Sequence, residues 1–259
     1  MSSYTILFLG DIVGRPGRSV VKEGLPSLQD AYQPLFTIVN GENSAGGVGI
    51  TPDIAEELFK QGVDAITLGN HAFNKREIYP YLATGKPVVR PANMPAMVPG
   101  KGLATVSKDG VELAVMNVCG RVYMESYDDP FHCVDFLFGS LATPHRLLDF
   151  HGEATSEKIA MGWHCNGRAS LVVGTHTHVQ TADERVLPGG TAYITDVGMC
   201  GPKDSVLGMD RDVILERFRT TLPMRFEVQN SPGVICGVVV SVERDTGRAT
   251  SIERIRFGE

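Results

Sequence analysis

The N-terminal part of the sequence contains apolar runs that each end in a polar turn rich in glycine or asparagine. Three such runs occupy residues 4–9, 35–39 and 63–68, and segments with helical spacing of apolar residues separate them. Runs of this length are typical of buried strands, and alternating strands and helices predict a parallel sheet. Because the carboxyl ends of parallel strands meet along one edge of a sheet, the polar side chains of these turns are expected to converge there.

Asp11 follows the first run, directly after Gly10, and has two interpretations. Aspartate is a preferred N-cap residue, so Asp11 could begin the helix expected over residues 18–28. At the tip of a rigid strand, the same carboxylate could instead hold a metal ion. Considered alone, Asp11 is better explained as a cap. Four further strand ends with complementary side chains reverse that preference in favour of metal ligation.

Five predicted strand ends therefore carry nitrogen or oxygen donors. They are Asp11, Glu42 with Asn43, Asn70 with His71, His151, and His176 with His178. Carboxylate, imidazole and amide donors together suit a pair of divalent transition metals better than magnesium alone, which prefers oxygen ligands and water. No cysteine occurs in these turns, which argues against a structural zinc site.

A pair of metal ions favours hydrolysis of a phosphate ester, because two ions about 3.5–4 Å apart can clamp both the attacking hydroxide and a phosphoryl oxygen. Glu42 lies between the strands that lead to Asp11 and Asn70, so we expect it to bridge the two ions. His71 adjoins Asn70 but should project differently, which leaves it to protonate the leaving group. Arg121, after a later strand, is a candidate contact for the substrate anion, with a plain surface arginine as the alternative.

The composition is that of an ordinary globular protein, with 42% hydrophobic and 21% charged residues among 259. We expect one domain over residues 1–259, because sheet strands are predicted on both sides of the proline-rich stretch 86–102. The net charge of −6 argues against a protein that wraps long nucleic acid, but a bound metal would still accept a small anionic substrate. Five scattered cysteines, and an N-terminal apolar run too short for a signal peptide or membrane span, predict a cytoplasmic protein.

Local signals place further elements along the chain. Thr51 followed by Pro52 predicts a helix start, and Lys108-Asp109-Gly110 predicts a hairpin turn. The other expected elements are hairpin strands at 103–106 and 111–118, strands at 147–150, at 169–173 and from 192, helices at 155–161 and 212–220, and a second hairpin of 234–242 with 250–257. A homo-oligomer is compatible with this pattern.

The ordered set of turns resembles the calcineurin-like metallophosphoesterases. The resemblance rests on Gly10-Asp11, Gly41-Glu42-Asn43, Gly69-Asn70-His71, His151 and Gly174-Thr-His176-Thr-His178. That superfamily usually has Gly-Asp where this chain has Gly41-Glu42. The glutamate, together with residues 149–158 and 195–202, looks like the YmdB-type branch, and the likeness covers nearly the whole chain. Gly152 stands where that branch commonly has a small residue such as alanine, and glycine should be tolerated there.

The resemblance implies a fold, a metal centre and an activity. The implied fold is an α/β, four-layer αββα sandwich in which two mixed β-sheets pack face to face with helices outside. One metal ion would take Asp11, Glu42, Asn43 and His178, the other Glu42, Asn70, His151 and His176, with His71 as proton donor. The ions are expected to be iron, with manganese or zinc as alternatives. The implied reaction is attack of a metal-bridging hydroxide on small phosphodiesters, including cyclic nucleotides such as 2′,3′-cyclic AMP.

Other functions fit parts of the pattern. A phosphomonoesterase would use the same ions, and a metal-loaded, nucleotide-binding regulatory protein would have little turnover. Metal-dependent amide or ester hydrolases also use His-x-His pairs, but normally on a barrel, which the late hairpins do not suggest. For the substrate base, Phe73 and Tyr123 are candidate stacking partners, with burial in the core as the alternative. The loop 41–49 could offer its backbone amides to a phosphate or could be a flexible turn.

Overall fold

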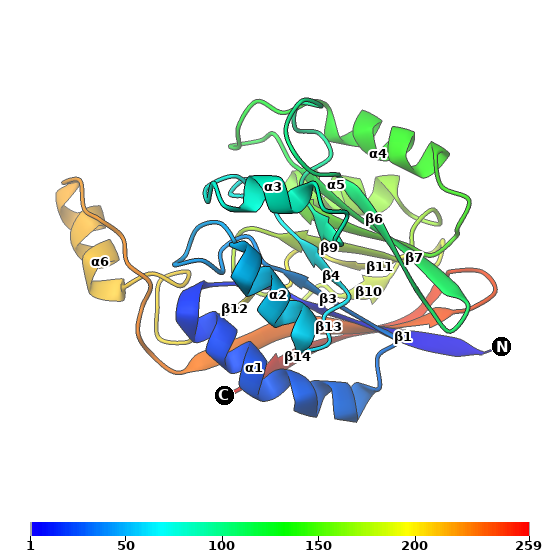
Figure 1. Ribbon diagram of the computed structural model, residues 1–259, viewed down its shortest axis with the longest axis horizontal. Coiled ribbons are helices and arrows are strands. Elements are labelled where there is room, and N and C mark those ends of the chain that lie inside the picture. Colours follow the sequence, from blue (N-terminus) through cyan, green and yellow to red (C-terminus); the bar gives the residue numbers. More distant parts are fainter. Residues whose placement is uncertain (1, 259) are drawn as a thin grey trace.

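Two mixed β-sheets form the centre of the molecule, which the computed structural model describes for residues 2–258 (Figure 1). The eight-stranded sheet has the order β2 (Asp11–Ile12), β12 (Met199–Pro202), β13 (Gly233–Glu243), β1 (Ser3–Leu9), β3 (Phe36–Asn40), β4 (Ala65–Thr67), β5 (Val88–Val89), and β14 (Ala249–Phe257) also pairs with β13. The six-stranded sheet has the order β10 (Arg185–Val186), β11 (Ala192–Ile194), β9 (Leu171–Thr175), β8 (Arg146–His151), β7 (Val111–Cys119), β6 (Leu103–Lys108). Each sheet has a parallel centre, β1-β3-β4-β5 in one and β7-β8-β9-β11 in the other.

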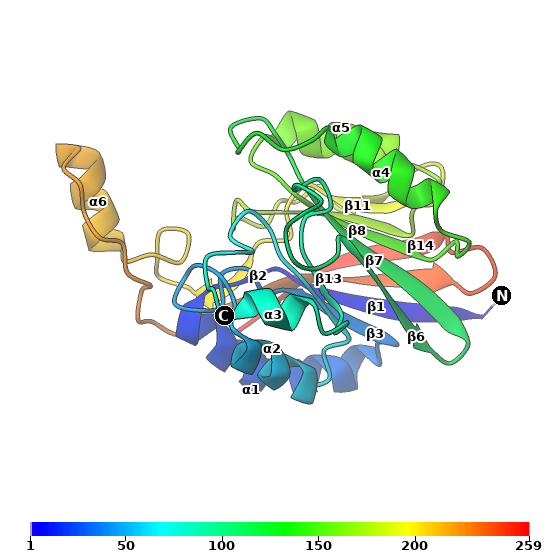
Figure 2. The same cartoon turned by 45° about the horizontal axis from the view of Figure 1, so that its top comes forward.

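Helices cover the outer face of each sheet. α1 (Gly14–Tyr32), α2 (Pro52–Lys60) and α3 (Ile78–Leu82) lie on the eight-stranded sheet, and α4 (Pro130–Gly139) and α5 (Thr155–His164) on the six-stranded sheet. The predicted four-layer αββα sandwich is therefore confirmed. α6 (Arg211–Thr220) stands away from both sheets in two views (Figure 1 and Figure 2). No helix between residues 2 and 258 has both the length and the apolar character that crossing a membrane requires.

β1 illustrates how the sequence builds these layers, because its side chains alternate between the two faces of the strand. Ile6 and Phe8 pack into the core between the sheets, whereas Leu7 and Leu9 pack in the core under the outer helices. All four side chains are fully buried, and burial of each contributes about 1.5–3 kcal/mol to folding. The run of residues 4–9 is therefore a strand buried on both faces, as predicted.

The start of α1 shows that Asp11 is not a helix cap. Val13 occupies the N-cap position of α1, and no side chain caps this helix. Asp11 lies in β2 instead, so it does not cap α1. Thr51 does cap α2, as predicted, because its Oγ1 accepts a hydrogen bond from the N–H of Ile54 at 3.4 Å.

The remaining predicted elements are largely confirmed. β6 pairs antiparallel with β7 around Asp109 and Gly110, whose φ angles of 46° and 76° fit a two-residue hairpin turn. β13 pairs antiparallel with β14, and α5 and α6 begin within one residue of their expected positions. Not predicted from the sequence were α3, α4 and the short strands β2, β5, β10 and β12. α4 does carry a start signal, since Asp129 caps it and Pro130 is its first residue.

Candidate metal centre

The seven expected ligands come together where the central parallel strands of the two sheets end. Asp11 lies in β2, Glu42 and Asn43 follow β3, Asn70 follows β4, His151 ends β8, and His176 and His178 follow β9. The pairing of β8 with β9 sets His151 opposite Thr175, one residue before His176. The predicted convergence of these turns is therefore present in the fold.

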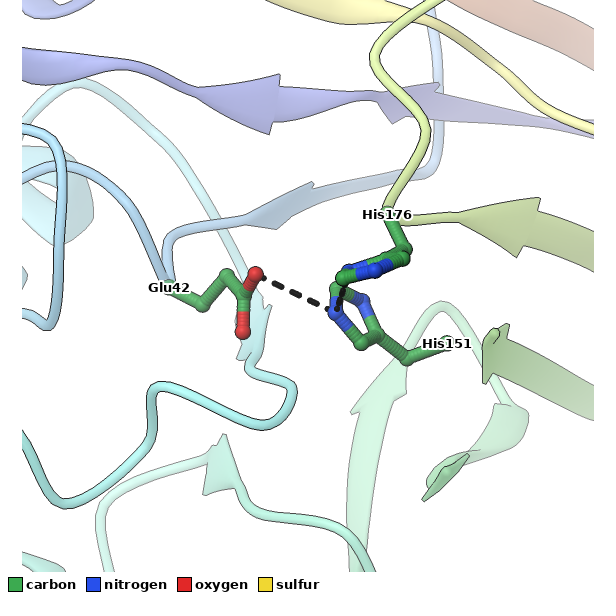
Figure 3. Close-up of side chains that lie close together, drawn as sticks. All are labelled: Glu42, His151 and His176. Atoms are coloured by element: carbon green, nitrogen blue, oxygen red, sulfur yellow. Dashed lines mark hydrogen bonds and ion pairs between the residues drawn. The ribbon is translucent and has the colours of Figure 1, made fainter. Parts of the chain in front are cut away.

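His151 occupies the middle of a first group of ligands. Its Nε2 lies 2.9 Å from Oδ1 of Asn70, 3.0 Å from Nδ1 of His176 and 3.1 Å from Oε1 of Glu42. Glu42 and His176 point toward His151 from separate loops (Figure 3). Donor atoms of Glu42, His151 and His176 all lie within 4.8 Å of one another, so these three residues could hold a metal ion.

A second group of expected ligands consists of Asp11, Asn43 and His178 together with Glu42. Nδ2 of Asn43 donates a hydrogen bond to Oε1 of Glu42 at 3.0 Å and lies 3.2 Å from Nε2 of His178. That nitrogen of His178 is also 3.7 Å from Oδ1 of Asp11, which is a charge contact rather than a hydrogen bond. Glu42 therefore belongs to both groups.

Two buried oxygen atoms of the second group are unusual. Within the described part of the chain, neither Oδ1 of Asp11 nor Oδ1 of Asn43 has a hydrogen-bond partner. A buried polar oxygen without a partner normally costs about 1–3 kcal/mol, and a bound cation is one way to satisfy it. The donor set of the second group therefore fits a metal ion as well.

Each of the three histidines makes a polar contact on its outer side. Nδ1 of His151 lies 2.8 Å from Oγ1 of Thr175, and Nδ1 of His178 lies 2.9 Å from the carbonyl oxygen of Leu207. For His176 the outer nitrogen is Nε2, 3.2 Å from the carboxylate of Glu153. Metal-binding histidines are typically fixed in this way, with the outer nitrogen donating and the inner nitrogen left to bind.

A buried polar network supports the first group from behind. Asp149 lies at its centre and accepts hydrogen bonds from Oγ1 of Thr175 at 2.6 Å, Oγ1 of Thr67 at 2.5 Å and Nδ2 of Asn40 at 3.0 Å. Asn40 in turn accepts a hydrogen bond from the N–H of Glu42 at 3.1 Å. The network thus ties Glu42 to the residue that orients His151. The sequence analysis missed Asp149, although its position two residues before His151 on a strand puts both on the same face.

Burial and neighbouring charges shift the pKa values of the three histidines in different directions. Burial alone would lower the pKa of His151, but the charge and hydrogen bond of Glu42, together with the charges of Asp11 and Asp149, outweigh burial and raise the pKa to about 9. Burial also opposes the charged form of His178, whose pKa nevertheless rises to about 9 beside Asp11. For His176, burial and the charge of His151 lower the pKa to about 4. His176 is therefore neutral at pH 7, whereas the other two rings carry a charge.

The packing around the centre leaves no room for a side chain at position 69. A Cβ atom on Gly69 would overlap Oε2 of Glu42 and would lie 2.5 Å from Nε2 of His151. Glycine is therefore required for the close approach of these two ligands. The loop that carries His176 and His178 is also under constraint, because both residues have positive φ angles, 97° and 63°, which residues with side chains rarely adopt.

The other candidate residues lie around this centre. The backbone N–H of His71 donates a hydrogen bond to Oε2 of Glu42 at 3.1 Å. Arg121 is exposed and forms an ion pair with Asp129 at 3.3 Å. Phe73 packs edge-on against Tyr79, which favours a core role for that ring. Tyr123 is 89% exposed and keeps its ring available for stacking.

Comparison with known proteins agrees with the observed fold. The chain is 54% identical over 256 residues to the 2′,3′-cyclic-nucleotide 2′-phosphodiesterase of Bacillus subtilis (strain 168), an alignment that covers 98% of this chain and 97% of that protein. The crystal structure of a novel phosphatase from Mycoplasma pneumoniae matches with a TM-score of 0.94 and 34% identity, over 99% of this chain and 94% of that one.

A crystal structure of a hypothetical protein from Thermus thermophilus matches with a TM-score of 0.93 and 39% identity, over 98% of this chain and 99% of that one. The family profile described as YmdB-like protein matches residues 7–255. These similarities extend over nearly the whole chain and confirm the resemblance seen in the order of the turns. The chain belongs to the YmdB-like protein family.

Proposed function

We propose that the protein is a metal-dependent phosphodiesterase that hydrolyses small phosphodiesters, among them cyclic nucleotides such as 2′,3′-cyclic AMP. One observation carries the proposal: among the described residues, the buried Oδ1 atoms of Asp11 and Asn43 have no hydrogen-bond partner. Oδ1 of Asp11 lies 3.7 Å from Nε2 of His178, and Asn43 contacts both that nitrogen and the carboxylate of Glu42 through its Nδ2. The name of the Bacillus subtilis relative supports the choice of a cyclic nucleotide as substrate.

The donor set supports two divalent transition metal ions, with iron favoured over manganese and zinc. One ion would be held by Asp11, Glu42, Asn43 and His178, and the other by Glu42, Asn70, His151 and His176. Mixed nitrogen and oxygen donors suit such metals better than magnesium. When bound, the metals would activate a water molecule and polarise the phosphoryl oxygen.

The chain itself would supply the remaining chemistry. We assign the proton that the leaving oxygen needs to His71, whose backbone N–H donates a hydrogen bond to Oε2 of Glu42. Arg121 would contact a phosphate oxygen, for which it would have to leave its exposed ion pair with Asp129. An exposed pair of this kind contributes only about 0–1 kcal/mol, so this rearrangement requires little energy.

A substrate comparison tests the proposal. The purified protein, loaded with Fe²⁺ or Mn²⁺, is assayed with 2′,3′-cyclic AMP, with bis(p-nitrophenyl) phosphate and with the corresponding monoester, and a chelator-treated sample serves as control. We expect both diesters to turn over faster than the monoester and the chelator to abolish turnover. Faster monoester hydrolysis would support a phosphomonoesterase instead. Two bound metals without any turnover would support a regulatory role.

A further inference from the structure

A buried ion pair lies behind the loop that carries two of the histidines. Nζ of Lys158 on α5 is 2.7 Å from Oδ2 of Asp196, and each side chain is only 1% exposed. Isolated buried charges are costly, and a buried ion pair contributes little net stability compared with apolar residues of the same size. Stability alone therefore does not account well for this pair, and its contacts point to another role.

Asp196 holds the residue between the two histidines. Its Oδ2 accepts hydrogen bonds from the N–H of Thr177 at 3.1 Å and from Oγ1 of Thr177 at 2.7 Å. Its Oδ1 accepts a hydrogen bond from the N–H of Gly198 at 2.8 Å, which fixes the carboxylate itself. Nζ of Lys158 donates a further hydrogen bond to Oδ2 and supplies the opposite charge in this buried place.

The backbone on either side of Thr177 needs such support. His176 and His178 have φ angles of 97° and 63°, a region that favours glycine over residues with side chains. A loop in this conformation persists only where its surroundings hold it. Thr177 lies between these two residues in the sequence. Both its backbone N–H and its side-chain hydroxyl are hydrogen-bonded to Asp196, which holds the turn in place.

We propose that Lys158 and Asp196 are positioning residues that set the orientation of His176 and His178 through Thr177. The inference rests on the proposed function, which assigns the two histidines to different metal ions. A single buried ion pair would therefore place one nitrogen ligand in each half of the centre at once. Neither residue is among the proposed metal ligands or substrate contacts.

A matched pair of variants of Thr177 tests this role. Thr177→Val keeps the shape but removes the hydroxyl donor, and Thr177→Ser keeps the donor. We expect Thr177→Val to bind Mn²⁺ about 10–100-fold more weakly, as expected for a lost contact behind a metal ligand, and Thr177→Ser to bind as wild type. Thr143→Val is the control, because the Thr143 hydroxyl donates to the carbonyl oxygen of Glu112 at 2.7 Å, away from the centre.

Two double variants separate positioning from general stability. Lys158→Met/Asp196→Asn and Lys158→Met/Asp196→Leu both remove the ion pair without leaving a lone buried charge, but only the asparagine keeps an acceptor for Thr177. We expect the asparagine variant to bind Mn²⁺ within a few-fold of wild type and the leucine variant at least 10-fold more weakly. Equal affinities in the two double variants, or wild-type affinity in Thr177→Val, would overturn the inference.

The positioning role can be tested without measuring phosphodiesterase activity. Mn²⁺ affinity is measured by calorimetry and the fold by thermal melting, and neither needs turnover. Where wild type hydrolyses diesters, Thr177→Val should lower kcat with KM nearly unchanged, and Thr177→Ser should restore it. A wild-type protein that binds Mn²⁺ without hydrolysing diesters would remove the phosphodiesterase assignment and leave the positioning role testable by affinity.

Discussion

The hydroxyl of Thr175 keeps a proton on Nδ1 of His151. Oγ1 of Thr175 lies 2.8 Å from Nδ1 of His151 and donates its only proton to Oδ1 of Asp149 at 2.6 Å. Since that proton is already used, the hydroxyl can only accept from His151, so Nδ1 of the imidazole must carry a hydrogen. Nε2, which faces Asn70 and Glu42, is then the nitrogen left for a metal.

Removing this hydroxyl should weaken metal binding. Thr175→Val leaves Nδ1 of His151 and Oδ1 of Asp149 without their partner, and we expect about 10–100-fold lower affinity for Mn²⁺. Thr175→Ser keeps the hydroxyl and should bind nearly as wild type. Calorimetric titration of wild type and the two variants with Mn²⁺ measures the difference in affinity. Unchanged affinity in Thr175→Val would mean that the hydrogen bonds of Thr175 with His151 and Asp149 do not orient His151.

Loss of His71 should slow turnover without removing metal. Because the proposed role of His71 is proton donation to the leaving group, His71→Ala should lower kcat by about 10²–10⁴-fold. The metal content per chain, measured by elemental analysis, should stay at the wild-type level. Bis(p-nitrophenyl) phosphate has a leaving group that needs little protonation, so its hydrolysis should fall less than that of 2′,3′-cyclic AMP. Parallel loss of metal and activity would argue that His71 is a ligand.

A single methyl group at position 69 should disrupt the centre. In Gly69→Ala the new Cβ would overlap Oε2 of Glu42, so the bridge and His151 must move. We expect at least 10-fold weaker Mn²⁺ binding and a loss of about 1–3 kcal/mol in unfolding free energy. Gly139→Ala is the control, since a Cβ there would meet nothing within 4 Å. Similar behaviour of the two variants would contradict the close-packing argument.

Elements of the fold could be predicted where the sequence of a segment by itself reflects its surroundings in the folded protein. The run of residues 4–9 is almost entirely apolar because both of its faces are buried, so it was recognisable as a strand without knowledge of its neighbours. Asp11 and His151 were recognisable as partners in one site because they follow or end such strands. Within each sheet, convergence of the strand ends follows from parallel pairing, but the approach of Asp11 to His151 also depends on how the two sheets stack.

The support behind the ligands was not predictable in the same way. Asp149 contacts Asn40, Thr67 and Thr175, which come from three other strands in two sheets. Their proximity depends on how the sheets stack, which no local pattern contains. The role of Lys158 was not predictable either. A lysine on a helix is normally expected at the surface, and its partner Asp196 is distant in sequence.

Metal uptake at pH 7 should release protons. In chelator-treated protein His151 and His178, with pKa values raised to about 9, are protonated, whereas His176, with its pKa lowered to about 4, is not. Because a bound nitrogen must lose its proton, full loading should release about two protons per chain, and apparent affinity should rise with pH toward 9. Calorimetry in two buffers of different ionisation enthalpy counts these protons. Uptake without release would contradict the assigned ligands.

The unequal roles of Asp11 and Glu42 predict different metal contents. Glu42 contacts both His151 and Asn43, one from each group of ligands, whereas Oδ1 of Asp11 lies 3.7 Å from Nε2 of His178 in the second group. Asp11→Asn should therefore keep the ion held by Glu42, His151 and His176, and retain about one metal per chain, while Glu42→Gln removes a bridging charge and should retain less than one. Elemental analysis after loading with Mn²⁺ and dialysis separates the two. Equal losses would mean that the ions bind as one unit and that Asp11 is as central as Glu42.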